Sequence, residues 1–196
     1  MERRDEILAA VLAILRSEGA AGLTTAAVAA RAHCSKKTLY RLFGDKQGML
    51  RALVEAQAGS VQGALAEASG GLPARTALEN GLAALIDLLT GEASLAINRA
   101  AMAEPGGELA TILLQSGRGD TLPIFEGLLR ALQQAGELGQ GEPRGMAARL
   151  IGLAMGERQV RALLGDADAR PGKEEIGKLA RGAVAALLQL EPPTRD

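Results

Sequence analysis

The sequence predicts an all-α fold, and three observations support that prediction. Ala and Leu recur at helical spacing along the whole 196-residue chain. β-Branched and aromatic residues nowhere alternate with polar ones over the length of a strand. Gly and Pro, at 25 and 7 positions, divide the chain into segments of helix length. We therefore expect three N-terminal helices joined through a long helix to a second helical part.

The first helix is expected over 3–18, and Gly19 is suited to end it. Its apolar residues lie on one helical face, at positions 7, 11, 14 and 15. A long fourth helix is expected over about 46–69, after Gly44-Asp45 has ended the third.

Hydroxyl side chains mark the starts of the two short helices between them. Thr24 or Thr25 can cap a helix that runs to about Ala32, because a Thr hydroxyl accepts a hydrogen bond from an otherwise unpaired amide. Ser35 does the same for a helix over 36–43. Only four residues, 32–35, connect the two helices.

The segment Gly70-Gly71-Leu72-Pro73 is the first strong break after these helices. The helices expected beyond it lie at 74–90, 93–103, 107–136 with a break near 117–120, 143–164 and 173–190. We expect two domains, 1–51 and 52–196, connected by the long fourth helix.

The lone His33 and lone Cys34 exclude several kinds of site. A structural zinc site needs about four Cys or His ligands, and one cysteine cannot form a disulfide within the chain. A nucleophile-base pair needs a base in reach, and sequence neighbours rarely meet in that way. We therefore expect no enzyme activity, no metal and no cofactor.

No stretch of the sequence predicts a membrane span. The longest run without Asp, Glu, Lys or Arg covers residues 19–30, well short of the roughly 20 apolar residues that a bilayer requires. Arg3 and Arg4 before the apolar residues 7–15 resemble a secretory signal, but charged residues flank both ends of that run and no clean cleavage site follows. A cytoplasmic protein is expected.

Charge is unevenly distributed along the chain. Residues 1–51 carry nine Lys or Arg against five Asp or Glu, whereas the remaining residues carry 13 against 18. Such asymmetry suggests an N-terminal part that binds a polyanion. Two short capped helices with a tight connection, the second one basic, form the helix-turn-helix pattern, in which the second helix lies in the DNA major groove.

The sequence of this region resembles the TetR/AcrR family of transcriptional regulators. Two segments carry the resemblance: Leu23-Thr24-Thr25-Ala26-Ala27-Val28-Ala29 and Ser35-Lys36-Lys37-Thr38-Leu39-Tyr40-Arg41-Leu42-Phe43-Gly44-Asp45-Lys46. The match covers about 50 N-terminal residues and is weaker beyond them. It implies a repressor that binds a palindromic operator on double-stranded DNA as a homodimer and is released by a small apolar or amphipathic ligand.

The resemblance also implies roles for individual residues in DNA binding. The residues concerned are Thr25, Lys36, Lys37, Thr38, Tyr40, Arg41 and Lys46. Thr25 would bind phosphate at a helix N-terminus, and Tyr40 and Lys46 would contact phosphates. Lys36, Lys37, Thr38 and Arg41 would reach base edges or phosphates.

His33 departs from the family pattern, which commonly has Gly in the turn, so a left-handed backbone is expected at a less permissive residue. Two interpretations stay open for each residue of the turn. His33 is a neutral surface residue or adds a pH-dependent charge near DNA. Cys34 is a small buried residue or, with a lowered thiol pKa, an oxidant sensor.

The second part of the chain is expected to hold the dimer interface and a ligand pocket. The last two helices carry apolar residues among Gly and Ala, and the family typically dimerises there. These residues are Met146, Leu150, Leu153, Met155, Ile176, Leu179, Val184, Leu187, Leu188 and Leu190. The candidate ligand contacts are Asn98, Arg99, Met102, Gln115, Leu122 and Phe125.

Simpler alternatives remain for each of these features. The basic cluster could be a solvated helix face, the last two helices could pack only within the monomer, and the candidate ligand contacts could be core or surface residues. A helical protein that binds small molecules without specific DNA recognition is the alternative function.

Overall fold

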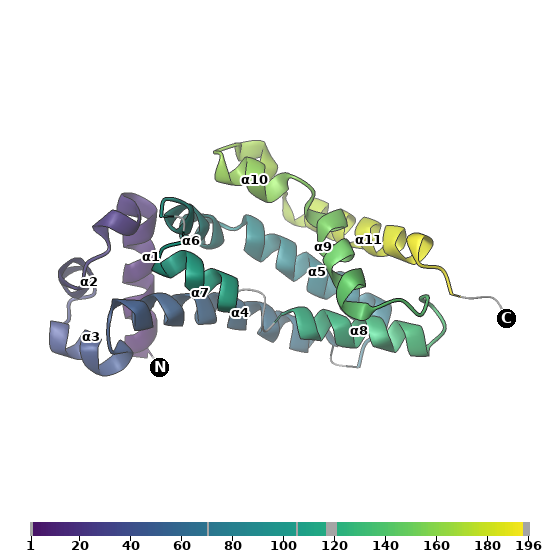
Figure 1. The fold of residues 1–196 in the computed structure, drawn as a ribbon, viewed down its shortest axis with the longest axis horizontal. Helices are drawn as coiled ribbons and strands as arrows, with labels where there is room; N and C mark the ends of the chain where they lie inside the picture. The colour runs from purple at the N-terminus through teal and green to yellow at the C-terminus, as the bar shows by residue number, and fades with distance from the viewer. Residues whose placement is uncertain (1, 70, 105, 117–120, 194–196) are drawn as a thin grey trace. The chain divides into compact units, whose positions relative to one another are not determined.

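The computed structural model describes residues 2–69, 71–104, 106–116 and 121–193. Within these ranges every regular element is a helix and none is a strand (Figure 1), so the all-α prediction is confirmed. The chain forms two compact units. The first comprises residues 1–58 and 92–118, and the second comprises residues 59–91 and 119–196.

The first unit combines the N-terminal helices with two helices from the middle of the chain. Its helices are α1 (Glu2–Gly22), α2 (Thr25–Arg31), α3 (Lys36–Phe43), the first part of α4 (Lys46–Ser69), α6 (Glu92–Met102) and α7 (Glu108–Ser116). Helix α1 packs against both α2 and α6. The predicted apolar face of α1 is buried, with Ile7, Val11 and Ile14 at most 1% exposed.

The predicted helix boundaries in this unit follow their capping residues. Gly19 has a φ of 67° and interrupts α1, as the sequence indicates. The Thr24 hydroxyl oxygen accepts a hydrogen bond from the Ala27 amide at 3.1 Å, so Thr24 rather than Thr25 is the capping residue of α2. Ser35 accepts one from the Thr38 amide at 3.1 Å. Gly44, with a φ of 81°, ends α3.

The second unit is built around four helices that pack on one another, α5 (Ala74–Thr90), α8 (Leu122–Gln134), α9 (Pro143–Met155) and α11 (Lys173–Leu190). A short helix α10 (Arg158–Leu163) and a 3-10 turn (Ala167–Ala169) connect α9 to α11. The core contains Leu78, Leu82, Phe125, Leu129 and Val184, none of which is exposed.

The predicted helix over 143–164 is wrong in one respect, because it is two helices. Gly156 has a φ of 50° and its amide donates to the Gly152 carbonyl, which ends α9. Left-handed backbone cannot continue a right-handed helix, so the chain turns before α10 begins at Arg158.

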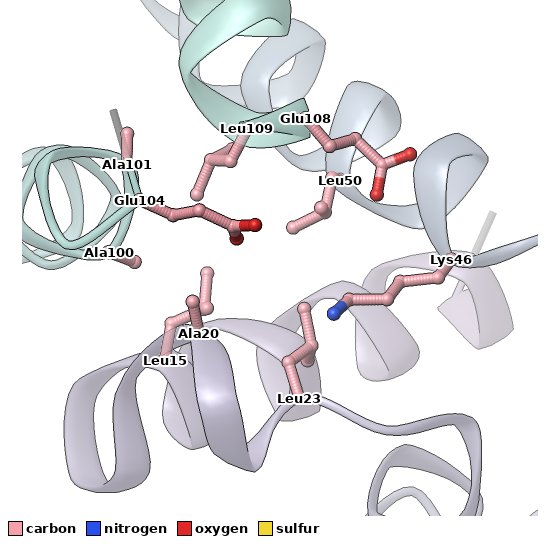
Figure 2. Close-up of a pocket in the computed structure, with 10 residues that line it drawn as sticks. All are labelled: Leu15, Ala20, Leu23, Lys46, Leu50, Ala100, Ala101, Glu104, Glu108 and Leu109. Atoms are coloured by element: carbon pink, nitrogen blue, oxygen red, sulfur yellow. The ribbon is translucent and has the colours of Figure 1, made fainter. Parts of the chain in front are cut away.

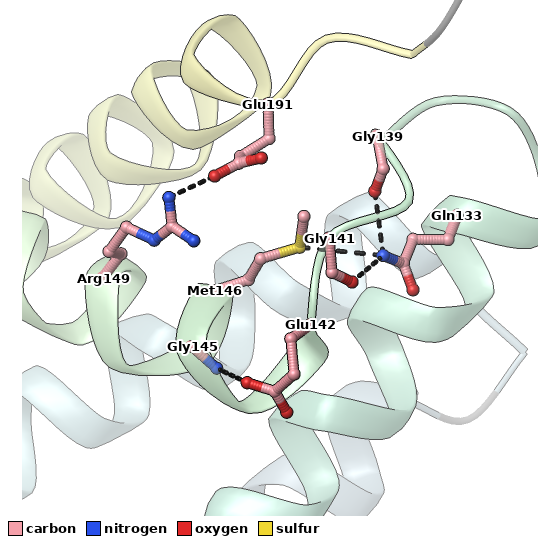
Figure 3. A network of polar contacts seen from close by, with 8 residues as sticks. All are labelled: Gln133, Gly139, Gly141, Glu142, Gly145, Met146, Arg149 and Glu191. Carbon is pink, nitrogen blue, oxygen red and sulfur yellow. Dashed lines mark hydrogen bonds and ion pairs between the residues drawn. The ribbon is translucent and has the colours of Figure 1, made fainter.

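The loop between α8 and α9 is fixed by side-chain contacts (Figure 3). The Gln133 amide group donates to the carbonyl oxygens of Gly139 and Gly141 at 2.8 and 2.7 Å. Arg149 on α9 forms an ion pair with Glu191, directly after α11. These contacts join the ends of three helices of the second unit.

Among the described residues, no single helix is long and apolar enough to cross a membrane, and one bent pair, α5 with α6, meets the criteria of length and composition together.

Candidate nucleic-acid interface

Helix α3 has one face in the core of the first unit and one face in solvent. Leu39 and Phe43 are 2% and 9% exposed, and Leu39 packs in the same core as Val28 of α2 and Ile7 of α1. Tyr40 is 53% exposed. Tyr40 therefore lies on the solvent side of α3 and Phe43 on its core side.

The exposed face of α3 is positively charged. Lys36, Lys37 and Arg41 are all exposed, and no ion pair between described residues involves any of them. Other basic residues of the unit do have partners. Arg16 pairs with Glu92, and Arg31 lies 3.8 Å from Glu18. Because these three residues have no ion-pair partner among the described residues, the charge of α3 is available to a polyanion.

The two threonines of the predicted DNA-binding set are half-buried. Thr25 is the first residue of α2, where the first-turn amides have no partner within the helix. The Thr38 hydroxyl lies 3.0 Å from that of Ser35, and Ser35 also caps α3. Thr38, a predicted DNA contact, therefore also takes part in the N-terminal cap of α3.

The turn between α2 and α3 has the predicted left-handed residue. His33 has a φ of 47° and, among the described residues, is the one non-glycine residue with positive φ. The amides of His33 and Cys34 donate to the carbonyls of Ala30 and Ala29, at 3.3 and 2.9 Å. Cys34 is half-buried.

Two arginines at the start of α1 contact this region. The Nη2 atom of Arg3 donates to the carbonyl oxygens of Ala32 and His33 at 2.9 and 2.8 Å. The guanidinium of Arg4 lies 5.2 Å from the centre of the Phe43 ring, a cation-π distance. The first turn of α1 thus contacts both the turn before α3 and the last residue of α3.

Lys46, the first residue of α4, is half-buried and lines a cavity of about 20 Å³ within the first unit. Figure 2 shows its side chain extending toward this cavity from one side and that of Glu104 from the other. Glu108 also lines the cavity, and its Oε1 atom is buried with no hydrogen-bond partner among the described residues. A cavity of this size holds about one water molecule.

A larger cleft of about 450 Å³ lies between α1 and α6 of the same unit. Leu15, Leu95 and Ala96 form apolar parts of its wall. Of the predicted ligand contacts, Arg99 lines this cleft, whereas Asn98 donates from its side-chain amide to the Ser94 carbonyl at 2.8 Å on its own helix. Met102 and Gln115 are exposed on α6 and α7.

The remaining two predicted ligand contacts belong to the second unit. Phe125 is completely buried in its core, and Leu122 is half-buried against that core. The six residues are thus distributed over both units.

Several residues of the candidate interface were not identified from the sequence. Arg3 and Arg4 were noted only as a possible signal sequence, and Glu104 and Glu108 are distant from Lys46 in the chain. Gly48 carried a usable signal, since glycine in the first turn of a helix is unfavourable. A Cβ atom at Gly48 would overlap the carbonyl oxygen of Phe43, so the close approach of α4 to α3 requires glycine.

Comparison with known proteins covers nearly the whole chain. The family described as "Bacterial regulatory proteins, tetR family" matches residues 7–53, and "AefR-like transcriptional repressor, C-terminal domain" matches residues 76–190. A search of curated proteins found no match.

Solved structures give the same result. A TetR transcriptional regulator from Agrobacterium tumefaciens is 31% identical with a TM-score of 0.79, over 97% of this chain and 95% of that one. The flavonoid-responsive regulator FrrA is 23% identical with a TM-score of 0.74, over 99% of both chains. FadR from Bacillus subtilis, solved with stearoyl-CoA, is 18% identical with a TM-score of 0.73, over 94% of this chain and 97% of its own.

The last two similarities concern the fold alone, whereas the family matches and the Agrobacterium structure identify the family. Its members are transcription factors rather than enzymes. This chain belongs to the TetR family of bacterial transcriptional regulators, with an N-terminal helix-turn-helix for DNA binding and a helical C-terminal domain for ligand binding.

Proposed function

We propose that this protein is a cytoplasmic repressor that binds a palindromic operator as a homodimer and is released from it by a small apolar or amphipathic ligand. One observation carries the proposal: α3, a capped helix on a buried apolar face, presents Lys36, Lys37 and Arg41 to solvent without acidic partners among the described residues. An exposed basic helix after a tight turn fits the DNA major groove.

The proposed contacts divide into those that position the protein and those that read bases. Lys36, Lys37, Thr38 and Arg41 contact base edges or phosphates, since they lie on the solvent side of α3 or in its first turn. The Tyr40 hydroxyl donates to a phosphate, Thr25 binds a phosphate at the start of α2, and Lys46 contacts phosphate from the start of α4.

A homodimer through α9, α10 and α11 would place two such helices on one palindrome. Most apolar residues first considered for this interface, such as Met146 and Leu150, are buried within the unit. Val160 and Leu164 are 59% and 83% exposed. A Cβ atom at Gly152 or Gly182 would meet no other atom within 4 Å, so packing within the protomer does not require these mid-helix glycines, and a second copy can approach them closely.

The cleft of about 450 Å³ supports the proposal of a small-molecule effector, because ligand sites usually have volumes of about 300–1,000 Å³. Apolar side chains line it together with Arg16, its ion-pair partner Glu92, and Arg99, which suits an amphipathic molecule. An effector that binds better to one conformation than to another would shift the population away from the DNA-binding form.

Selection of duplexes from a random-sequence DNA pool tests the DNA-binding part of the proposal. We expect the full-length protein to enrich a palindrome with half-sites about one helical turn, ~34 Å, apart or a multiple of that distance. Lys37→Ala and Arg41→Ala should change the enriched sequence and weaken binding by about 1–3 kcal/mol. Tyr40→Phe, which removes only the hydroxyl, should weaken binding to all sequences alike.

Arg75→Ala is the matched control, because it removes one exposed positive charge from α5, outside the first unit. Enrichment of no sequence would favour the alternative of a helical small-molecule-binding protein. Enrichment of the same sequence by all variants would contradict the proposed reading of bases by Lys37 and Arg41. The enriched duplex then serves to test a panel of small molecules. The effector proposal is contradicted if no compound of the panel changes the affinity for the duplex.

A further inference from the structure

The first turn of α1 carries an arginine that contacts the helix-turn-helix from outside it. Arg3 lies 29 and 30 residues before the two residues whose carbonyl groups it binds, Ala32 and His33. Its other terminal nitrogen forms an ion pair with Glu6, three residues further along α1. The guanidinium is therefore held at both ends, by a carboxylate of its own helix and by two consecutive carbonyls of the turn.

The backbone amides and carbonyls of the turn form hydrogen bonds with different partners. The amides of His33 and Cys34 point back to carbonyls of α2. The carbonyls of Ala32 and His33 point the other way, at the C-terminal end of α2, where a helix carries partial negative charge. A cation there is favourable, and the hydrogen bonds from an ionised donor are stronger than those between neutral groups.

Arg3 binds the turn at the residue whose backbone conformation is least favourable for its type. His33, with a φ of 47°, occupies the left-handed region, which glycine adopts freely and other residues adopt rarely. Ser35, the cap of α3, follows only two residues later. The conformation of the turn therefore sets the direction in which α3 leaves it, and with it the positions of Lys36 and Lys37.

We propose that Arg3 is a positioning residue for DNA binding, which holds the turn in the left-handed conformation that His33 does not itself favour. Arg3 acts through the turn and contacts neither base nor phosphate. The inference rests on the proposed function of α3 in reading DNA. It predicts that the need for Arg3 depends on the residue at position 33.

A double-mutant cycle tests this dependence. The variants Arg3→Ala, His33→Gly and the double variant are compared with the wild-type protein, all as full-length chains, for affinity to the duplex that the wild type enriches. We expect Arg3→Ala to weaken binding about tenfold. In the His33→Gly background the same change should weaken it much less, because glycine adopts the left-handed conformation unaided.

The salt dependence of binding separates positioning from direct contact. Loss of one phosphate contact lowers the slope of log affinity against log salt by about one, so an unchanged slope in Arg3→Ala supports positioning. A slope reduced by about one, with equal losses of affinity in both backgrounds, would assign Arg3 to phosphate and overturn the proposal. Unchanged affinity in Arg3→Ala would also overturn it.

Arg16→Ala is the matched control, since it removes a positive charge from the same helix at a residue that pairs with Glu92 and not with the turn. Its loss of affinity should be smaller than that of Arg3→Ala and independent of position 33.

Hydrogen exchange of the Cys34 amide gives a readout that needs no DNA. We expect faster exchange in Arg3→Ala than in the wild type, and no such acceleration in the His33→Gly background. If the wild-type chain enriches no duplex, the proposed function fails. The exchange rates of the Cys34 amide then test by themselves whether Arg3 holds the turn. Equal exchange rates in the four proteins would then overturn it.

Discussion

Gly48 is the residue at which the junction of α3 and α4 is most sensitive to substitution. Its amide donates to the Asp45 carboxylate at 2.7 Å, and a Cβ atom would overlap the Phe43 carbonyl. Because backbone cannot give way as a flexible side chain can, Gly48→Ala should lower the free energy of unfolding by roughly 1–3 kcal/mol. Denaturant unfolding followed by circular dichroism measures this change.

Gly59→Ala is the matched control on the same helix, since a Cβ atom there meets nothing within 4 Å. Alanine is the better helix former, so this variant should be more stable than the wild type by about 0.5–1 kcal/mol. The interpretation of Gly48 is contradicted if both variants change stability in the same direction.

Asp166 provides a prediction on pH at the residue scale. The Nε atom of Arg161 donates a hydrogen bond to Oδ2 of Asp166 at 2.7 Å, and this bond lowers the pKa of the Asp166 carboxyl. A lowered pKa in the folded state means that the contribution to stability is present at neutral pH and is lost as the pH falls through that pKa. Asp166→Asn should therefore lower the melting temperature slightly at pH 7, and the difference should shrink on acidification.

An NMR titration of the side-chain carboxyl of Asp166 checks the same contact directly. The midpoint should lie below the ordinary value for Asp, and Arg161→Gln should raise it toward that value. An unchanged midpoint in Arg161→Gln would show that Arg161 does not cause the shift.

Some residue properties followed from the sequence. The positive φ of His33 was expected because the family that this region resembles commonly has Gly at that position of the turn. The overlap at Gly48 involves backbone five residues away across a helix boundary. It depends on the angle between α3 and α4, which residue types alone do not give.

At the scale of elements, α4 and α7 bring opposite charges to one cavity. Lys46 begins α4, where a cation opposes the helix dipole, whereas Glu108 begins α7, where an anion is favoured. With Glu104 they line the cavity of about 20 Å³. Because the two carboxylates line the same cavity as Lys46, the proposed contact of Lys46 with phosphate would have to compete with them.

Glu108→Gln should therefore strengthen binding to the enriched duplex by about two- to fivefold, the range expected for one partly screened charge pair. In a Lys46→Met background the same change should have much less effect, since the competing cation is gone. Lys46→Met itself should weaken binding and reduce the salt slope by about one. Titrations of the four proteins at several salt concentrations measure these effects.

Glu55→Gln controls for the general effect of removing a negative charge, because Glu55 is exposed on α4 and does not line this cavity. Equal strengthening by Glu55→Gln and Glu108→Gln would argue against a specific competition for Lys46.

Most helices were predictable because their boundaries are encoded by neighbouring residues. Thr24, Ser35 and Gly44 cap or end helices by contacts within four residues. The break at Gly156 was missed, because a single glycine within a long apolar pattern does not reveal whether its backbone turns left-handed.

At the scale of the whole molecule, the proposed homodimer makes a prediction about mass. Val160 and Leu164 are four residues apart, at the surface of α10 and directly after it, so one partner surface can cover both. Introducing charge there with Val160→Glu and Leu164→Glu should convert a dimer into a monomer, because burying an unpaired carboxylate is strongly unfavourable. Sedimentation equilibrium measures the change in mass.

Leu114→Glu is the control, since Leu114 is 79% exposed on α7 of the first unit. It should leave the mass unchanged. A dimer that persists in the double variant would exclude this surface as the interface. Loss of the dimer should also weaken binding to the palindrome far more than binding to a single half-site.

The two compact units do not coincide with the two sequence ranges 1–51 and 52–196. Helices α6 and α7 belong to the unit of the N-terminal helices, although the C-terminal family match at 76–190 includes them. The sequence does not reveal that α6 joins the first unit. Helix α6 packs on α1 through apolar faces, and an apolar face does not by itself specify its partner.

The sequence by itself determined the all-α class, the helix-turn-helix and the basic face of α3. These follow from capping, helical periodicity and charge, which act over a few residues. Only the tertiary structure decided that Arg3 contacts the turn, that Glu104 and Glu108 share a cavity with Lys46, and that α6 and α7 pack with the N-terminal helices. The contacts of Arg3 with the turn and the grouping of Lys46 with the two glutamates join residues 29 to about 60 positions apart, and Arg16 of α1 pairs with Glu92 of α6 across 76 positions. Their free energy depends on how whole helix faces pack.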